Sequence, residues 1–361
     1  MSGMTSTRIL SGVQPSGKLH LGNYFGAIRQ HIALQDQGDA FYFIADYHAL
    51  TSLKDAEARE AEEAARAGRK QGKSAREILA ENVQDVALDY LALGLDPEKA
   101  TFYRQSDVPE VTELAWILST VCGMGLLERA HSYKDKLAHG ITPSVGLFTY
   151  PVLMAADILI VRALQVPVGK DQVQHLEMTR DMAGYFNRAY AALFPEPREL
   201  LAEVPVVPGT DGRKMSKSYG NTIEIFAEGK ALKAAINAIV TQPIELGTPI
   251  DPDTDHIFAL YKLFASAEEV ESLAEQYRDP TRNAESRKGR PFGYGDAKQL
   301  LQAKIDAFFG PARERRKALA AAPQHVEAIL RNGAIRARRE ARATMELVRT
   351  AVGMARAPVG G

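Results

Sequence analysis

Residues 11–28 read SGVQPSGKLHLGNYFGAI and follow a short apolar run at residues 8–10. Four glycines therefore stand where a strand is expected to pass into a helix. Their spacing matches neither of two common phosphate-binding patterns, G-x-G-x-x-G and G-x-x-x-x-G-K-[ST]. We expect the helix to begin near residues 18–20, with Gly22 in its first turn, where the missing side chain lets a flat ring approach the backbone. Because free N–H groups at a helix start favour phosphate, the stretch predicts a nucleotide site, with a simple strand–helix turn as the alternative.

Short apolar, β-branched or aromatic runs alternate with helical patterns through the first half of the chain. The expected strands are residues 8–10, 41–45, 100–104 and 166–169, and the helical patterns are 24–36, 76–93, 111–121 and 151–163. This alternation predicts an α/β fold with a doubly wound parallel sheet. Polar residues follow each run: Gln14 and His20, Asp46 and His48, Gln105 and Ser106, Asp171 and Gln172. Since ligands bind beyond the carboxyl ends of such strands, we expect one site assembled from four strand ends.

The composition is that of an ordinary globular protein, with 45% hydrophobic and 25% charged residues. The single cysteine, Cys122, excludes an internal disulfide and a cysteine-rich zinc site. No apolar run reaches the roughly eighteen residues of a membrane span, and the N-terminus lacks the apolar centre of a signal peptide. We therefore expect a cytoplasmic protein without a membrane partner.

A length of 361 residues predicts about two domains. Strand signals end near Thr222, so we expect an α/β domain over 1–222 and a helical domain over 223–361. The net charge of −1 is uneven, because residues 311–356 hold eleven Lys or Arg against four Asp or Glu, a local +7 that leaves −8 elsewhere. This asymmetry favours a polyanionic partner for the C-terminal part, with a solvated helix face as the alternative.

Residues 55–76, DAEAREAEEAARAGRKQGKSAR, consist largely of Ala, Glu, Arg and Lys and have almost no apolar face. This composition predicts an exposed helix interrupted by a mobile Gly/Lys loop. The role of the segment is open, with RNA contact as one hypothesis.

A second informative stretch, DGRKMSKSYGN, spans residues 211–221. Lys214 and Lys217 lie three residues apart among small polar residues, so a loop of this kind can close over a triphosphate and place two ammonium groups on its developing charge. A surface turn is the alternative for a generic K-x-x-K pattern. The full string KMSKS at 214–218 is far less generic.

HLGN at residues 20–23 resembles the first signature of the class I aminoacyl-tRNA synthetases, and KMSKS resembles their second. Both occur in the family's order. The resemblance implies a Rossmann-like core of the HUP type, a helical C-terminal domain for anticodon recognition, and ATP that carries Mg²⁺ with it as a substrate. The first signature ends in Asn23 rather than His, a variation familiar in the tryptophanyl branch of the family.

The stretch TYPVLMAADILIV at 149–161 is similar to the specificity helix of the tryptophanyl and tyrosyl branches. Tyr150, Met154 and Asp157 fall at i, i+4 and i+7, on one helix face. Tyrosyl enzymes carry Gln at the position of Met154, whereas a soft thioether suits an indole face. Asp157 is expected to accept the indole N–H, which favours L-tryptophan. An ordinary buried helix with a capped Asp is the alternative.

The resemblance also implies roles for the remaining candidate residues. Val166 and Val168 line the amino-acid pocket, His48 forms its wall, and Gln172 faces the polar end of the amino acid. Gln14, Pro15 and Ser16 shape the first nucleotide loop, where His20 and Asn23 hold phosphate. Further nucleotide contacts are expected from Gly22, Gly169, Lys170, Asp171, Val206, Met215, Ser216 and Ser218, with Lys214 and Lys217 stabilising the transition state. Lys134 and Lys136 match a mobile loop that reaches phosphate, with an ordinary exposed lysine pair as the alternative. No protein-bound metal is expected.

The predicted reaction is the formation of tryptophanyl-adenylate, followed by transfer of the amino acid to tRNA(Trp). The resemblance further implies a homodimer with the helices of 107–140 at its interface, although the apolar run there also suits an internal core. Two other hypotheses remain open. One is the tyrosyl branch, with the same chemistry and a different pocket; the other is a paralogue that binds tRNA or a partner protein with weak aminoacylation.

Overall fold

A computed structural model describes residues 7–66, 68–69, 71–130, 133–134, 144–169, 172–201 and 206–355. The chain divides into two compact units, each assembled from separated pieces. Unit 1 comprises Met1–Gly17, Gln30–Ala202 and Leu319–Gly361, and unit 2 comprises Lys18–Arg29 and Glu203–Ala318. The expected functional boundary at residue 222 stays a prediction, since the compact units are interleaved along the chain.

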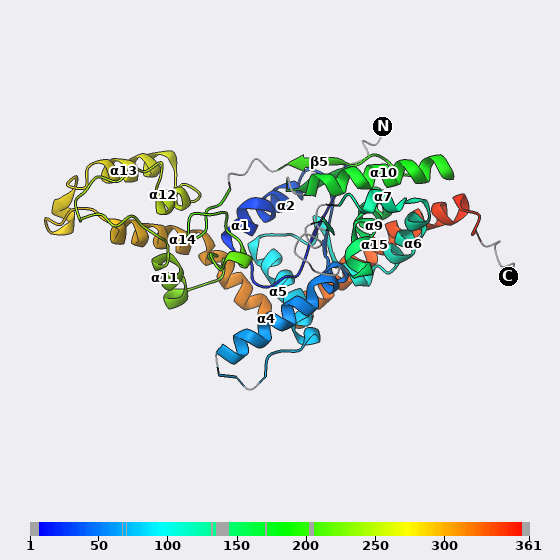
Figure 1. The fold of residues 1–361 in the computed structure, drawn as a ribbon, viewed down its shortest axis with the longest axis horizontal. Coiled ribbons are helices and arrows are strands. Elements are labelled where there is room, and N and C mark those ends of the chain that lie inside the picture. Colours follow the sequence, from blue (N-terminus) through cyan, green and yellow to red (C-terminus); the bar gives the residue numbers. More distant parts are fainter. Residues whose placement is uncertain are drawn as a thin grey trace. The chain divides into compact units, whose positions relative to one another are not determined.

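Unit 1 contains a five-stranded parallel sheet in the order β3-β2-β1-β4-β5 (Figure 1). The strands are β1 (Arg8–Val13), β2 (Asp39–Ile44), β3 (Ala100–Arg104), β4 (Gln165–Val168) and β5 (Arg198–Leu201). Because β1 lies between β2 and β4, the strand order reverses there, as it does in a doubly wound sheet. The predicted α/β class and the four predicted strands are confirmed.

The fifth strand was not predicted. Its sequence, RELL, is short and charged, and none of its residues is buried, because it forms the edge of the sheet. An edge strand with one open side carries neither the continuous apolar run nor the alternation by which strands are recognised.

Helices cover the sheet and fill the connections of unit 1. They are α2 (Arg29–Leu34), α3 (Asp46–Ala49), α4 (Leu53–Arg66), α5 (Ala75–Leu93), α6 (Glu110–Val121), α7 (Met124–Leu127), α9 (Val145–Ile160), α10 (Val173–Ala189) and α15 (Pro323–Ala351), with 3₁₀ turns η2 (Leu50–Ser52) and η3 (Gln105–Asp107). Helix α9 begins six residues before its predicted start, because Ser144 caps it by accepting a hydrogen bond from Leu147 N–H. Pro151 lies inside the helix rather than at its first residue.

The last helix, α15, lies in unit 1 and packs on β3 and α6. A β-carbon at Gly333 would lie 1.8 Å from the carbonyl oxygen of Phe102, so the two backbones are in direct contact. Arginines of α15 also pair with acids of α6: Arg338 with Glu110 at 2.8 Å, and Arg349 with Glu113 at 2.5 Å.

Unit 2 is helical after Thr222, as predicted. Its elements are α1 (Leu21–Asn23), the π-helical turn η1 (Tyr24–Ile28), the 3₁₀ turns η5 (Lys217–Tyr219) and η6 (Ala284–Arg287), and helices α11 (Gly229–Asn237), α12 (His256–Tyr261), α13 (Ala267–Arg278) and α14 (Tyr294–Ala320). Aromatic rings of Tyr24, Phe25, Phe264 and Phe309 pack edge to face within it. Across the described ranges, no helix is both long and apolar enough to cross a membrane.

Candidate active site

Asp157, on α9 of unit 1, is a buried carboxylate, with 4% of its surface exposed. Gln105 donates Nε2–H to both carboxylate oxygens, at 2.9 Å and 2.8 Å, and His48 Nε2 lies 2.9 Å from Oδ2. Burial raises the pKa of the Asp157 carboxyl, and the hydrogen bonds to His48 and Gln105 act in the opposite direction. A carboxylate has about four acceptor positions, so Oδ1 keeps capacity for one more N–H donor.

The structure brings two predicted pocket residues, His48 and Tyr150, together beside this carboxylate. The ring of His48 lies edge-on to Tyr150, with centroids 6.2 Å apart, and Tyr150 OH is hydrogen-bonded to His175 Nε2. Met154 is half-buried on the same helix, packed against the hydrophobic core. Sequence reasoning gave His175 no role, because a single histidine in an amphipathic helix carries no signal of its own.

Gln105 was recognised only as a polar residue after a strand, and the structure gives it a specific place. Asp46 accepts hydrogen bonds from the backbone and hydroxyl of Ser106, which ties the ends of β2 and β3 together. Gln105 Oε1 accepts from Tyr47 N–H at 3.1 Å, leaving Nε2 directed at Asp157. The polar residues at two adjacent strand ends therefore serve to orient one buried carboxylate.

The loop after β1 also lies in unit 1. A β-carbon at Gly12 would stand 2.4 Å from the Phe43 ring, so only glycine fits this strand position. Gln14 is exposed and donates Nε2–H to Ser52 Oγ at 3.1 Å. Pro15 is buried and Ser16 exposed, and the loop ends at Gly17 with φ 97°.

The first signature begins in unit 2. His20 is 6% exposed, and its Nδ1 is buried without a hydrogen-bond partner. Burial, with Lys217 as a second cause, lowers the pKa of His20 to about 4, so the ring is neutral at pH 7. Asn23 Oδ1 accepts from His20 N–H at 3.0 Å. A buried neutral imidazole with one unsatisfied nitrogen suits a polar ligand such as a nucleotide phosphate.

Gly22 is required by its neighbours. A β-carbon there would lie 3.0 Å from His20 Nδ1 and 3.4 Å from Met215 Cβ. The first signature therefore packs directly against the second within unit 2.

Backbone pairing also joins the two signatures. Leu21 N–H donates to the Ile223 carbonyl, and Ile225 N–H donates to the Leu19 carbonyl, both at 3.0 Å. This short antiparallel bridge ties the first signature to the residues that directly follow the KMSKS loop.

Asn221 organises the KMSKS loop and was missed by sequence reasoning. Its Oδ1 accepts from Ser216 N–H at 2.8 Å, while its Nδ2 donates to Asp211 Oδ1 at 2.7 Å and to the Lys214 carbonyl at 3.2 Å. A β-carbon at Gly209 would fall 2.2 Å from Asn221 Nδ2, so the chain passes closely around the buried amide. One side chain thus fixes both ends of the loop.

The rest of the loop combines one buried residue with exposed polar ones. Met215 is buried and its N–H donates to the Val207 carbonyl at 2.9 Å, whereas Lys214 and Lys217 are exposed. Ser216 Oγ and Ser218 Oγ lie 2.8 Å apart. The buried methionine anchors the loop between two exposed lysines.

The other predicted residues are placed as follows. Val166 is buried in β4 and Val168 is half-buried, Gly169 is exposed, and Val206 is 67% exposed. Gln172 precedes α10, and its N–H donates to the Gly169 carbonyl at 2.9 Å. Lys134 is exposed, while Lys136, Lys170 and Asp171 lie outside the described residues. Within the described ranges, no group of three or more His, Cys, Asp or Glu could hold a metal ion.

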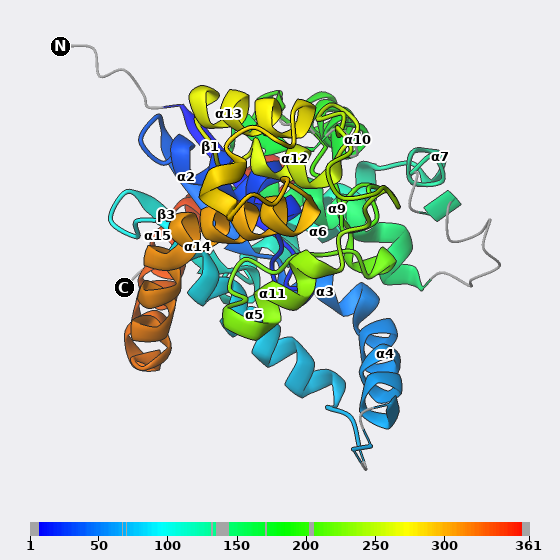
Figure 2. The same cartoon turned by 90° about the vertical axis from the view of Figure 1, so that its left-hand side faces the viewer.

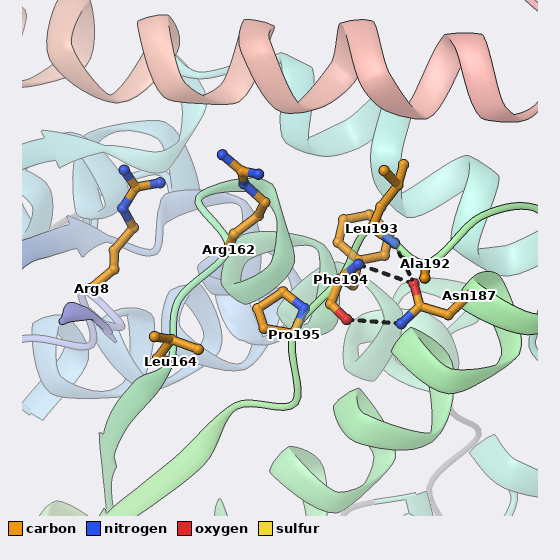
Figure 3. Close-up of a pocket in the computed structure, with 8 residues that line it drawn as sticks. All are labelled: Arg8, Arg162, Leu164, Asn187, Ala192, Leu193, Phe194 and Pro195. Atoms are coloured by element: carbon orange, nitrogen blue, oxygen red, sulfur yellow. Dashed lines mark hydrogen bonds between the residues drawn. The ribbon is translucent and has the colours of Figure 1, made fainter. Parts of the chain in front are cut away.

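A hollow of about 560 Å³ lies elsewhere on unit 1 (Figure 3). It is lined by Arg8, Arg162, Leu164, Asn187, Ala192, Leu193, Phe194 and Pro195, none of which is a predicted site residue. Arg8 bonds there to Asp39, Glu340 and the Val161 carbonyl. These hydrogen bonds fix the start of β1, and they occupy the Arg8 guanidinium with partners from the protein itself.

Comparison with known proteins agrees with the resemblance of the two signatures. The family model of class I tRNA synthetases (W and Y) matches residues 4–310. A tryptophan–tRNA ligase of Rhodopirellula baltica is 47% identical over 348 residues, covering 96% of this chain and 99% of that protein. The corresponding ligase of Fusobacterium nucleatum is 49% identical over 334 residues, covering 92% and 93%.

A solved structure gives the same result. The tryptophanyl-tRNA synthetase of Campylobacter jejuni, complexed with ADP and tryptophan, superposes with a TM-score of 0.84 at 44% identity. The match covers 96% of this chain and all of that one.

Proposed function

The chain belongs to the class I tRNA synthetases of the tryptophan and tyrosine group, and we propose that it activates L-tryptophan with ATP and transfers it to tRNA(Trp). As a member of this group it is an aminoacyl-tRNA ligase. Relatives at 47% and 49% identity carry the tryptophan name, and one relative of known structure was solved with ADP and tryptophan.

The buried carboxylate of Asp157 is the main structural support for tryptophan as the amino-acid substrate. Gln105 and His48 fix its two oxygens, and one acceptor position remains at Oδ1. An indole N–H satisfies that position, and the half-buried Met154 on the same helix offers a soft apolar surface to the ring. A tyrosine hydroxyl lies at a different place from an indole nitrogen, and Met154 offers it no strong hydrogen-bond partner.

The first step forms an anhydride. An oxygen of the tryptophan carboxylate bonds to the α-phosphorus of ATP, the bond from that phosphorus to the bridging oxygen breaks, and pyrophosphate leaves with the Mg²⁺ that entered with ATP. Neutral His20, with Asn23, holds phosphate at the first signature. Lys214 and Lys217 supply positive charge as the leaving group forms. Positioning and charge account for the rate, so no covalent enzyme intermediate is needed.

Several nucleotide contacts belong to the same proposal. We propose that the turn formed by Gln14, Pro15, Ser16 and Gly22 surrounds the adenosine. Gly169, Lys170 and Asp171 then contact the ribose, and Val206 contacts the adenine ring. Met215, Ser216 and Ser218 complete the KMSKS loop. The unpartnered Nδ1 of His20 and the exposed ammonium groups of the loop support these assignments.

In the second step a hydroxyl of the 3′-terminal ribose of tRNA attacks the carbonyl carbon of the adenylate, and AMP leaves. We propose that residues 223–361 hold the anticodon arm. Part of the basic excess in that region serves the fold instead, because Arg338 and Arg349 pair with acids of α6. RNA contacts must therefore come from basic residues outside these pairs.

We also propose a homodimer and a cytoplasmic location. Trp116 on α6 is 72% exposed, Met124 on α7 63% and Val145 on α9 79%. Large apolar side chains so exposed on neighbouring elements are typical of a protein interface. They support the expectation that helices between residues 107 and 140 meet a second copy.

Pyrophosphate exchange into ATP tests the reaction and the amino acid together. We expect purified protein to show exchange with tryptophan and none with tyrosine. Exchange with tyrosine alone would assign the chain to the tyrosyl branch and overturn the Asp157 argument. No exchange with either, from folded protein that binds tRNA(Trp), would favour a paralogue without efficient aminoacylation.

A further inference from the structure

The charged segment between the pocket wall and α5 forms a helical hairpin with one basic end. Helices α4 and α5 pack together within unit 1 and meet at a tip that points away from the sheet (Figure 2). We define the basic tip as Arg66, Arg69, Lys73 and Arg76, all of which are exposed. From Arg66 to Arg76 the sequence contains no Asp or Glu.

As predicted, an exposed helix, α4, is followed by a loop before α5; the described residues of that loop contact the helices on both sides. Ala75 N–H donates to Glu57 Oε1 at 3.0 Å, so the start of α5 is tied to α4. A β-carbon at Gly72 would lie 3.1 Å from Cα of Ala61, so the returning chain passes against the α4 backbone. Ser74 and Glu77 form a capping box at the start of α5.

The charges of the hairpin are sorted along its length. On the stem helix α4, five acids (Asp55, Glu57, Glu60, Glu62 and Glu63) outnumber the two bases Lys54 and Arg59, whereas the tip holds bases and no acid. Arg69 pairs with Glu60 at 2.9 Å, Arg66 with Glu62 at 3.5 Å, and Lys73 with Glu81 of α5, but exposed pairs of this kind are weak and exchange readily for a phosphate. A polyanion is therefore attracted to the tip and repelled from the stem.

The hairpin is also continuous in sequence with the wall of the amino-acid pocket. Elements α3, η2 and α4 follow one another from Asp46 to Arg66, and His48 of α3 contacts the pocket carboxylate. The 14 residues of α4 span about 20 Å at 1.5 Å per residue. An RNA whose 3′ end enters the pocket carries phosphates over such a distance.

We propose that the basic tip binds backbone phosphates of the acceptor arm of the tRNA while its 3′ end occupies the pocket. The inference rests on the proposed function, since it takes tRNA as the substrate. The contact is electrostatic and independent of sequence, so it contributes affinity and position and leaves tRNA identity to other contacts.

The test uses the full chain with all four tip residues changed, R66Q/R69Q/K73Q/R76Q. We expect the Kd for a tRNA(Trp) transcript to rise about tenfold or more, and the slope of log Kd against log salt to fall by about two, at roughly 0.9 per lost phosphate contact. Tryptophan-dependent pyrophosphate exchange, which needs no tRNA, should keep its wild-type rate. The matched control is R188Q/R198Q, two exposed arginines on α10 and β5 of the same unit, which should leave the salt slope unchanged.

A second variant, expected to strengthen tRNA binding, separates the electrostatic effect from a general loss of binding caused by mutation. Glu63→Gln removes a stem acid one helical turn before Arg66 and should strengthen tRNA binding two- to threefold. An unchanged Kd and salt slope in the tip variant would overturn the proposal, as would a loss of pyrophosphate exchange. If instead the proposed function is wrong, the wild type itself will show no tryptophan-dependent pyrophosphate exchange.

Discussion

Individual side chains decide how the two signatures are held, and Asn221 illustrates this most clearly. Its amide bridges Ser216, Lys214 and Asp211, so it fixes the backbone on both sides of the KMSKS lysines. No motif rule points to it, because an asparagine after a glycine in a loop reads as an ordinary turn residue. Gln105 and His175 escaped for the same reason, since their roles come from contacts between distant parts of the chain. The signature residues themselves were predictable from local sequence.

We expect Asn221→Ala to lower kcat for pyrophosphate exchange by about 10- to 100-fold, because the lysines lose their fixed position on the leaving group. Tryptophan binding, measured by calorimetry, should change little. Asn187→Ala is the matched control, since Asn187 also bridges three backbone groups, at Leu193 and Phe194. A similar loss of kcat in both variants would show a general loss of stability and contradict the positioning role.

The buried ring of His20 predicts a pH dependence of stability. Its pKa is lowered to about 4 in the folded protein, against about 6.5 in an unfolded chain. The unfolded state therefore binds the extra proton first, so this contribution is fully present above pH 6.5 and is lost as the pH falls towards 4. A difference of this size corresponds to at most about 3 kcal/mol.

Urea unfolding of the wild type and of His20→Asn at pH 7 and pH 4.5 measures this contribution. We expect the stability advantage of the wild type to shrink at the lower pH. A constant difference between the two proteins at both pH values would contradict the assignment.

Among the elements, buried parallel strands were predictable and the edge strand was not. β2 and β3 carry continuous apolar runs because both faces are covered, whereas β5 has no buried residue and no such run. The packing of α15 on β3 was also beyond sequence reasoning, because periodicity shows that a helix is amphipathic without showing what it packs against.

The contact between α15 and β3 depends on one glycine. Gly333→Ala places a β-carbon 1.8 Å from the Phe102 carbonyl, so the helix must move away. We expect a loss of about 1–3 kcal/mol in the free energy of unfolding. Gly146→Ala, in the first turn of α9, meets nothing closer than 3.9 Å and should be neutral or stabilise by up to about 1 kcal/mol. Equal melting temperatures for the two variants would disprove the close packing.

On the scale of the whole molecule, the compact units were not predictable from composition. The helical character after Thr222 was evident, but the return of α15 to unit 1 and the inclusion of residues 18–29 in unit 2 depend on long-range pairing. Unit 1 holds the candidate amino-acid pocket, and unit 2 holds both signatures.

The proposed homodimer makes a prediction of its own. We expect Trp116→Glu to place a charge in the interface and convert a dimer into a monomer, measured by light scattering during gel filtration. Tyr190→Glu, at a side chain 43% exposed on the surface after α10, is the control and should keep the wild-type mass. A monomeric wild type, or a dimeric Trp116→Glu, would contradict the proposed interface.

The central claim is that Asp157 selects tryptophan by accepting its indole N–H. The most direct measurement compares kcat/KM in pyrophosphate exchange for tryptophan and for its benzothiophene analogue, in which sulfur replaces the N–H, using the wild type and Asp157→Ala. We expect the wild type to prefer tryptophan by about 100-fold or more, because a site built around a donor rejects a ligand without one. In the variant the preference should fall close to one. An equal preference in both proteins would contradict the account, since the N–H would then be recognised elsewhere.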